Sequence, residues 1–397
     1  MGAGPAGLAL AAACCREGLE VVILDRTHGA WRNQYAAWED ELVGLGYQDI
    51  FKHVWSDAIV WIDEGEKRTL RRSYGVVDNE RCRETMLNAT KDAQKVVANV
   101  SNLEPLGIGG RVTCEDGRSF EAECIVDAMG GGGGLGHRPQ PTSFQTAYGI
   151  LAEVKGTTQQ QSVTLMDFRE PGPGAPSLPG GLPSFLYCMQ WPDGRWFFEE
   201  TVLVARPKVS VDLLRERLYA RLKARGIEVL RVDEVERCEI GMDVEPPPHD
   251  ASFLAFGAGG GLVHPATGYS FVESLRRAPR VAAECARQVG LKRQARSIGT
   301  VMDALWTADE RKCHALYQFG SNAVSGFDAA DTRRFMRAFF GLPDDVWSAY
   351  LSRRLTGGEV QSTMLTMFRK FPLRLKRKMT GISFWNPKLL VRGIFGH

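Results

Sequence analysis

The sequence lacks the long apolar runs, paired cysteines and leader peptide that would place it among membrane-spanning or secreted proteins. No run of about eighteen apolar residues occurs, so no membrane-spanning helix is expected. The start has none of the basic, apolar and small-residue order of a signal peptide. The nine cysteines are odd in number and contain no Cys-x-x-Cys pair, which argues against both a disulfide framework and a structural zinc site. We therefore expect a reducing compartment and no metal.

Acidic residues are absent after Glu359, although the whole chain of 397 residues is nearly neutral at +2. This last segment carries Arg369, Lys370, Arg374, Lys376, Arg377, Lys378, Lys388 and Arg392, interleaved with large apolar residues. Such a mixture is typical of a surface that rests on an anionic membrane. A solvated basic helix that packs its apolar side inward is the alternative. Nucleic acid is not expected as a partner, because nothing else in the chain forms a basic groove.

A glycine-rich turn stands at the start of the chain. Its glycines, at G-x-G-x-x-G spacing, are Gly2, Gly4 and Gly7. A helical run over 8–17 and an apolar strand over 21–24 follow, and the strand ends at Asp25, which is placed to bind a ribose hydroxyl. This order predicts a dinucleotide site with the pyrophosphate at the helix N-terminus. The strand that should precede Gly2 is missing, so we expect an N-terminally truncated chain whose transit or targeting peptide was lost with it.

Two later segments favour a flavin over a simple dinucleotide. Residues 124–130 form a short predicted strand that ends in Asp127-Ala-x-Gly130, a pattern found where the sheet returns beneath FAD. Residues 253–257 predict another strand, which runs through Gly257 into further glycines. A turn at 264–269 and a helix over 270–285 come next, and the turn offers backbone N–H groups and a positive helix end to a flavin carbonyl or a phosphate. His264 is interpreted as a turn residue fixed by Pro265, with direct proton transfer as the alternative.

Two adjacent glutamates, Glu199 and Glu200, interrupt a run that otherwise predicts a buried strand, 196–204. Side chains alternate faces along a strand, so the two carboxylates should point in opposite directions. A carboxyl group that faces an apolar cavity has a raised pKa and can act as a general acid. The alternative from the residues alone is an edge strand with both glutamates solvated. Trp196, Phe197 and Phe198 are interpreted as packing residues, with cation–π stabilisation as the alternative.

These segments together resemble the lycopene cyclases of plants, algae and cyanobacteria. The resemblance covers nearly the whole chain in order. The matching segments are 33–41 (Asn-Gln-Tyr-Ala-Ala-Trp-Glu-Asp-Glu), 53–55, 60–64, 145–149, 166–169, 183–189, 197–201 (Phe-Phe-Glu-Glu-Thr), 264–269 (His-Pro-Ala-Thr-Gly-Tyr), 332–335 and 339–340.

The resemblance implies an FAD-dependent flavoprotein of carotenoid biosynthesis, an isomerase-like enzyme without net redox change. The flavin is needed in its reduced form, with NADPH as electron source, and an end of lycopene or of a monocyclic carotene is protonated, closed and deprotonated. The acid of the family motif corresponds to Glu199, with Glu200 beside it in a structural network. The residues expected at the cofactor are Gly2, Gly4, Gly7, Asp25, Arg81, Asp127, Gly130, Gly257, His264, Pro265, Gly268 and Tyr269.

Some positions depart from the family pattern. Val76 and Asn79 stand where the family often has arginine, so Arg81 or Arg83 is the candidate to contact the flavin instead. Ala258 stands where related hydroxylases carry an aspartate, a loss that lycopene cyclases share. Segments 38–41, 197–198 and 266–270 look more like ε-cyclases, whereas 63–67 and 203–207 look more like β-cyclases. The sequence therefore leaves the type of ring open.

The expected fold is α/β. A Rossmann-like FAD domain spans 1–135 and is completed by 251–290, an antiparallel-sheet substrate domain spans 136–250, and a helical, membrane-associated region spans 291–397. A plastid (chloroplast) membrane is the expected location, or a photosynthetic membrane in a cyanobacterium, with contacts to other carotenoid enzymes. Two other hypotheses are a flavin-dependent monooxygenase or reductase acting on an isoprenoid and a non-catalytic carotenoid-binding remnant.

Overall fold

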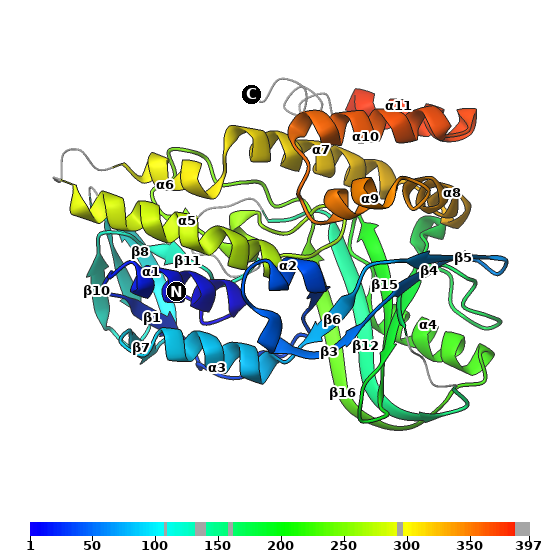
Figure 1. Ribbon diagram of the computed structural model, residues 1–397, viewed down its shortest axis with the longest axis horizontal. Coiled ribbons are helices and arrows are strands. Elements are labelled where there is room, and N and C mark those ends of the chain that lie inside the picture. The colour runs from blue at the N-terminus through cyan, green and yellow to red at the C-terminus, as the bar shows by residue number, and fades with distance from the viewer. Residues whose placement is uncertain (107–108, 132–139, 158–161, 292–296, 386–397) are drawn as a thin grey trace.

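The computed structural model describes residues 1–106, 109–131, 140–157, 162–291 and 297–385, and for residues 381–385 the backbone alone. Three groups of elements make up this part of the chain (Figure 1): a glycine-rich α/β half, a large sheet, and a set of C-terminal helices beside both. The α/β architecture expected from the sequence is confirmed. The basic and apolar residues expected at 386–397 lie outside the described residues.

The glycine-rich half is built on two pairs of short parallel strands. β1 (Val22–Asp25) pairs with β7 (Gln94–Val97), and β11 (Val126–Asp127) pairs with β17 (Leu254–Ala255). The helices of this half are α1 (Pro5–Arg16), α3 (Asn79–Ala89) and α5 (Phe271–Gly290). α1 begins with proline at its first turn, where no N–H partner is needed, and continues through buried leucine and alanine, which favour a closely packed helix.

Met1 and Gly2 bridge the two strand pairs. The Met1 amine donates to the Val126 carbonyl oxygen at 2.8 Å, and the Gly2 N–H donates to the Leu24 carbonyl oxygen at 2.7 Å. The Ala128 N–H in turn donates to the Met1 carbonyl oxygen at 2.9 Å. These two residues therefore lie between β1 and β11, directly before α1.

The large sheet has seven strands in the order β16-β12-β15-β14-β13-β4-β5. Their bounds are β4 (Ala58–Asp63), β5 (Glu66–Leu70), β12 (Phe144–Lys155), β13 (Val163–Asp167), β14 (Phe185–Gln190), β15 (Trp196–Ala205) and β16 (Glu228–Gly241). All neighbouring strands are antiparallel except β13 and β4. β4 and β5 join this sheet, although residues 1–135 were expected in the cofactor domain. β4 pairs with β13, about a hundred residues further along the chain, and local sequence patterns do not predict pairing over such a distance.

α4 (Val211–Ala224) covers one face of this sheet. Its leucines, Leu214, Leu218 and Leu222, recur at helical spacing and pack against Ile150 and Phe198 of the central strands. The smaller elements are β2 (Ala36–Trp38), α2 (Glu39–Val43), η1 (Gln48–Ile50), β3 (Phe51–Trp55), β6 (Tyr74–Val77), β8 (Val100–Pro105), β9 (Gly110–Cys114), β10 (Ser119–Ala122), η2 (Pro179–Gly181) and η3 (Gly257–Gly260).

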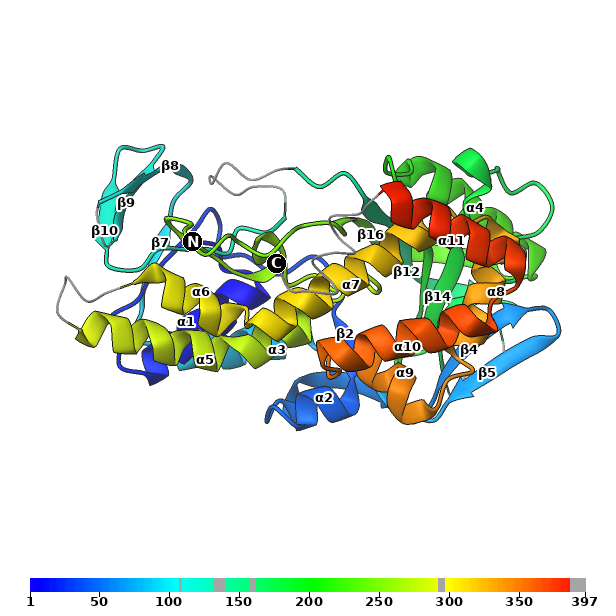
Figure 2. The same ribbon diagram turned by 90° about the horizontal axis from the view of Figure 1, so that it is seen from above.

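The C-terminal helices cover the other side of the large sheet. They are α6 (Ile298–Leu305), α7 (Ala308–Val324), α8 (Ala329–Phe339), α9 (Asp344–Leu351), α10 (Gly357–Lys370) and α11 (Leu373–Trp385). Viewed from above, α7 runs from the glycine-rich half toward the sheet, and α10 and α11 lie over the sheet end (Figure 2). Capping boxes at Thr307 and Thr356 fix where α7 and α10 begin. No helix within the described ranges is long and apolar enough to cross a membrane.

Candidate active site

A cavity of about 710 Å³ lies where the three groups of elements meet. The glycine-rich half contributes Gly130 and Ala258, the large sheet contributes Leu165 and Glu199, and the C-terminal helices contribute Phe339. Much of the remaining wall on the helix side is aromatic or made of methionine: Phe335, Phe340, Phe371, Met336, Met364, Met367 and Met379. The cavity is therefore bounded by apolar helices on one side and by the sheet with its glutamate on the other.

Strand alternation separates the two glutamates of β15. Glu199 lines the cavity. Glu200 is fully buried on the opposite face of the sheet, where its carboxylate accepts from the Arg221 guanidinium at 2.7 and 2.8 Å and from the Ser184 hydroxyl at 2.5 Å. Arg217 stands 3.7 Å away. The opposite orientation expected from the sequence is confirmed, and the alternative of two solvated glutamates on an edge strand is excluded because β15 lies inside the sheet.

The strand register brings a second glutamate to Glu199. On β12, Gly149 pairs with Glu199 of β15 on one side and with Glu236 of β16 on the other. Residues directly opposite in an antiparallel sheet point to the same face. Gly149 has no side chain, and a Cβ there would stand 3.5 Å from the Glu199 Cβ and 3.0 Å from the Phe197 Cζ. The glycine therefore leaves room on this face for the Phe197 ring and for the side chains of the two glutamates that flank β12.

Three polar side chains form a cluster at this point: Glu199, Glu236 and Cys238. One carboxyl oxygen of each glutamate and the Cys238 sulfur all lie within 4.8 Å of one another. Glu199 accepts from the Thr201 hydroxyl at 2.6 Å. Removal from water raises the pKa of Glu199 to about 8, with a further contribution from the Glu236 charge and opposition from the Thr201 hydrogen bond. A carboxyl group with this pKa holds its proton at neutral pH.

Glu236 is better supplied with hydrogen-bond donors than Glu199. Its carboxylate accepts from the Gln34 backbone N–H at 3.2 and 3.3 Å and from the Cys238 thiol at 3.2 Å. Burial raises the pKa of Glu236 to about 7, and these donors counteract the rise. Burial also raises the pKa of the Cys238 thiol. A metal ion needs deprotonated ligands, so these raised pKa values oppose metal binding by the cluster.

Sequence reasoning missed Glu236. It lies in β16, whose neighbouring residues are mostly polar and exposed, so the local pattern gives no sign of a buried carboxyl group. The available signal was Gly149 within the apolar run of β12, because a glycine inside a strand often marks a close approach. That signal does not say which residue approaches.

The aromatic residues of β15 divide between the two faces. Trp196 and Phe198 stack on each other on the Glu200 side, with ring centroids 5.4 Å apart, so they pack the core as interpreted from the sequence. On the cavity side the Tyr74 hydroxyl lies 2.7 Å from the Tyr269 hydroxyl and accepts from the Tyr187 hydroxyl at 3.4 Å. Burial raises the pKa of all three phenols, so they stay neutral.

The glycine-rich loop has the shape that a phosphate site requires. Gly2 has a φ of 94°, and a Cβ there would stand 2.5 Å from the Ala128 carbonyl oxygen. A Cβ at Gly7 would collide with the Gly2 carbonyl oxygen. Gly4 precedes α1, no side chain caps the helix there, and no atom lies within 4 Å of a Cβ placed on it. The helix N-terminus thus ends in open space.

Asp25 holds this loop. Its carboxylate accepts from the backbone N–H groups of Ala3 at 2.8 Å, Thr27 at 2.9 Å and His28 at 2.8 Å. Burial acts to raise the pKa of Asp25, but the three donors outweigh it and the pKa is lowered. Asp25 therefore lies beside the loop, and the three backbone N–H groups occupy much of the hydrogen-bonding capacity of its carboxylate.

The other expected cofactor residues fall in different places. Gly130 lines the cavity, whereas Asp127 is buried and accepts from the Met129 N–H at 3.1 Å. Gly257 has a φ of 71°, and a Cβ there would stand 2.7 Å from the Ala6 Cβ, so the glycine lets η3 approach α1. Arg81 is exposed on α3, donates to the Asp49 carbonyl oxygen at 3.1 Å, and is not part of the cavity wall.

His264 is held as a neutral ring in the turn at 264–269. Its Nδ1 accepts from the Ala266 N–H at 3.0 Å, and its Nε2 therefore donates to the Tyr350 carbonyl oxygen, also at 3.0 Å. Burial, aided by the nearby Arg353 charge, lowers the pKa of His264 to about 3. These contacts agree with a turn histidine rather than a proton carrier. Gly268 is required in the same turn, because its φ is 80° and a Cβ would collide with Gln145.

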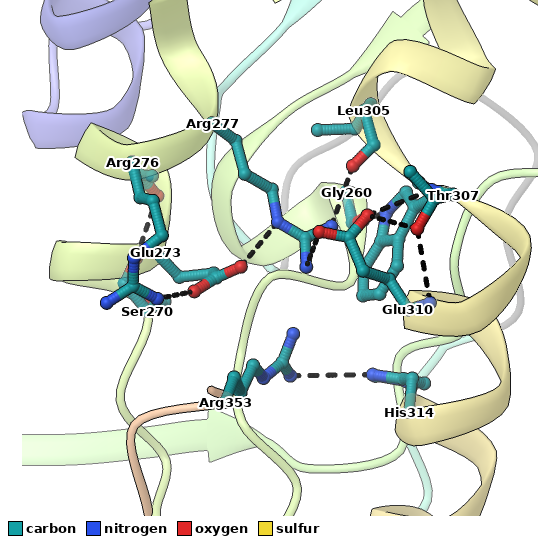
Figure 3. Close-up of polar contacts among 12 residues, drawn as sticks. Gly260, Ser270, Glu273, Arg276, Arg277, Leu305, Thr307, Glu310, His314 and Arg353 are labelled. Carbon is teal, nitrogen blue, oxygen red and sulfur yellow. Dashed lines mark hydrogen bonds and ion pairs between the residues drawn. The ribbon is translucent and has the colours of Figure 1, made fainter. Parts of the chain in front are cut away.

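Figure 3 shows a network of charged side chains that includes Glu273 and Arg277 of α5, the helix that follows this turn. Arg277 donates to the Glu273 carboxylate at 2.5 Å and to the Leu305 carbonyl oxygen at 2.7 Å, which joins α5 to α6. Arg353 donates to the Val263 carbonyl oxygen at 2.6 Å and lies 3.4 Å from His314 Nδ1. The N-terminus of α5 and the turn before it are thereby fixed against the C-terminal helices.

Comparisons with known proteins agree on one family. A family model described as lycopene cyclase protein matches residues 1–377. The chain is 35% identical over 386 residues to a chloroplastic lycopene beta cyclase of Arabidopsis thaliana, covering 93% of this chain and 76% of that protein. It is 33% identical over 381 residues to a chloroplastic neoxanthin synthase of Solanum lycopersicum, covering 93% and 76%.

Among solved structures the similarity shows the fold. A geranylgeranyl bacteriochlorophyll reductase-like protein of Thermoplasma acidophilum superimposes with a TM-score of 0.65 at 12% identity, covering 98% of this chain and 97% of that chain. Klebsiella pneumoniae HpxO complexed with FAD and uric acid superimposes with a TM-score of 0.58 at 17% identity, covering 92% and 95%. The fold is thus that of FAD-binding flavoproteins.

The Glu200 network predicts a stability effect. Glu200→Gln leaves the buried Arg221 without its counter-charge, so we expect the free energy of unfolding to fall by about 3 kcal/mol. Urea denaturation measures this. Glu153→Gln, which removes an exposed ion pair with Arg231 on the same sheet, should change the stability much less. Equal stability of the two variants would contradict the structural role of Glu200.

Proposed function

The chain belongs to the lycopene cyclase family, and from this premise we propose that it closes the linear end of lycopene, or of a monocyclic carotene, with Glu199 as the proton donor. The observation that carries the assignment of the acid is the position of Glu199 in the cavity wall, where no cation pairs with it among the described residues and removal from water raises its pKa to about 8. An alkene is a very weak base, so its protonation needs an acid in a site without competing water. Glu200 acts in the structure of the sheet instead.

The cavity wall supports the steps that follow protonation. The proton leaves the Glu199 oxygen as a new C–H bond forms at the linear end, and ring closure then moves the positive charge to a ring carbon. Aromatic residues of the cavity wall, among them Phe339, Phe340 and Tyr187, can stabilise a positive charge through the faces of their rings. Loss of a ring proton restores a neutral product, so the reaction consumes no electrons.

FAD is the cofactor that this fold accommodates. The open helix N-terminus at Gly4 would hold the pyrophosphate, Asp25 would fix the loop around it, and Gly130, Ala258 and the turn 264–269 would face the flavin ring, because they line the cavity. Arg81 contributes at most at the periphery. Bound flavin in its reduced form, with NADPH as the electron source, would supply a negative charge near the carbocation.

The plastid membrane is the location that fits this activity, because the curated relatives are chloroplastic and a C40 hydrocarbon must be collected from lipid. Leu365 on α10 and Leu373 on α11 are 51% and 64% exposed. They stand among the exposed cations Arg369, Lys370, Arg374 and Arg377. This α10–α11 surface combines the charge and the apolar contact that an anionic bilayer binds.

Replacement of the acid is expected to abolish cyclisation. In bacteria that accumulate lycopene, the chain should yield ring-containing carotenes, and Glu199→Gln should leave lycopene unchanged while FAD stays bound. Activity should fall as pH rises through about 8, because Glu199 then loses its proton. Chromatography of the carotenoids reports both the conversion and the ring type. Unchanged lycopene with folded, FAD-loaded wild-type protein would contradict the proposal.

The phosphate site can be tested separately from folding. Gly4→Ala adds a methyl group that meets no other described residue within 4 Å apart from its chain neighbours, so stability should not change. FAD affinity should fall about ten-fold, because the methyl group meets the pyrophosphate. Titration followed by flavin fluorescence measures the affinity. Gly358→Ala in α10, which is equally unhindered, should leave FAD binding unchanged.

The α10–α11 surface predicts membrane binding. Flotation with vesicles that contain anionic phospholipids should carry the wild-type protein upward, and Leu365→Asp with Leu373→Asp should reduce the bound fraction several-fold. The control is Leu230→Asp, because Leu230 is 58% exposed on β16, outside this surface. Equal flotation of all variants would assign the surface to another role.

A further inference from the structure

We propose that Glu199 and Glu236 form a carboxyl–carboxylate pair that shares one proton, in which Glu236 keeps Glu199 protonated before the reaction and makes the pair a strong base after it. The proposal rests on the proposed function for its chemistry. Its geometry rests on the sheet alone.

The strand register brings the carboxyl groups of Glu199 and Glu236 together. Tyr187, Glu199, Gly149 and Glu236 form one row across β14, β15, β12 and β16, all on the cavity face. Neighbouring strands are about 4.8 Å apart, so the two glutamates start about two strand spacings from each other. Their side chains bridge that distance over Gly149, and the carboxyl oxygens come within 4.8 Å.

No cation neutralises the pair. Among the described residues, no lysine or arginine forms an ion pair with Glu199 or Glu236, in contrast to Glu200 on the other face. Two carboxyl groups this close in a site of low polarity cannot both ionise at moderate cost, so the pair retains one proton. Dyads of this kind titrate together, with one apparent pKa raised.

The hydrogen bonds decide where the proton stays. Glu236 accepts from the Gln34 N–H and the Cys238 thiol, and these donors favour its charged form. Glu199 accepts from the Thr201 hydroxyl alone among the described residues. The proton therefore stays on Glu199 of β15.

Other titratable groups around the pair do not take over this role. The phenols of Tyr74, Tyr187 and Tyr269 have raised pKa values and stay neutral. The Glu234 charge on β16 acts to raise the pKa of Glu236, and the Cys238 thiol stays protonated because burial raises its pKa. The remaining charged groups of the cavity wall are Glu41, Glu239, Glu273, Arg276 and Arg353; Glu41 and Glu273 are paired with Arg276, and Glu239 is paired with Lys208.

The pair completes the proton balance of cyclisation. When Glu199 gives its proton to the alkene carbon, two carboxylates face one carbocation, and their mutual repulsion raises the proton affinity of the pair. A ring C–H bond then breaks, its electron pair forms the product double bond, and the proton returns to the pair. One proton leaves and one returns, so the site is ready for the next turnover without exchange with solvent.

The test compares Glu236→Gln with Glu199→Gln in the FAD-loaded protein. Glu236→Gln removes the neighbouring charge, so the alkaline limb of the kcat profile should move to lower pH by about one unit, with kcat at pH 8 reduced about five-fold and KM unchanged. Glu236→Asp keeps the charge and should recover part of the activity. Glu153→Gln on β12 should behave as wild type.

A second readout does not depend on turnover. Infrared spectra over pH should show one protonated carboxyl C=O band that persists near neutral pH, disappears in Glu199→Gln and titrates at lower pH in Glu236→Gln. If the band and the pH profile of a folded Glu236→Gln protein match the wild type, the pair does not exist. If the infrared bands behave as expected but neither the wild type nor any variant cyclises lycopene, the pair is supported and the proposed function is wrong.

Discussion

The site depends on one constraint in the sheet. Gly149, which has no side chain, pairs with a glutamate on each of its two neighbouring strands. Backbone hydrogen bonds of β12 to β15 and β16 set the register, and the register sets which side chains share a face. A shift by one residue would turn Glu199 toward α4 and Glu200 into the cavity. The chemistry of the cavity is therefore fixed by the ladder of the sheet rather than by a flexible loop.

The two adjacent glutamates of β15 show how environment divides identical side chains between tasks. Glu200 is surrounded by Arg221, Arg217 and Ser184, so its charge is matched and its position is rigid. Glu199, one residue earlier, pairs with no cation within the described ranges and has a neighbouring carboxyl group, and both conditions favour its protonated form. The ion pair on one face also helps to hold the strand against α4, which keeps the acid on the other face in its register.

Much of the fold was predictable from local sequence. The glycine spacing, the helix at α1 and the strand at β1 follow from patterns within 25 residues, and strand alternation placed Glu199 and Glu200 on opposite faces. Glu236 was not predictable, because its role arises from pairing between segments almost 90 residues apart. The association of β4 and β5 with the large sheet was missed for the same reason. Arg81 was expected to contact the flavin because Val76 and Asn79 stand where the family often has arginine. In the structure Arg81 lies on the exposed side of α3.

The contacts of His264 have a consequence for the way a long hydrocarbon enters. The imidazole ties the turn 264–269 to α9 through the Tyr350 carbonyl, and the turn also faces the cofactor side of the cavity. Lifting α9 away would leave buried polar groups unpaired on both partners. The methionine side chains that α10 and α11 contribute to the cavity wall are flexible, because thioether chains change rotamer at little cost. This part of the wall can therefore adjust its shape to the substrate while the acid and the cofactor side stay in register.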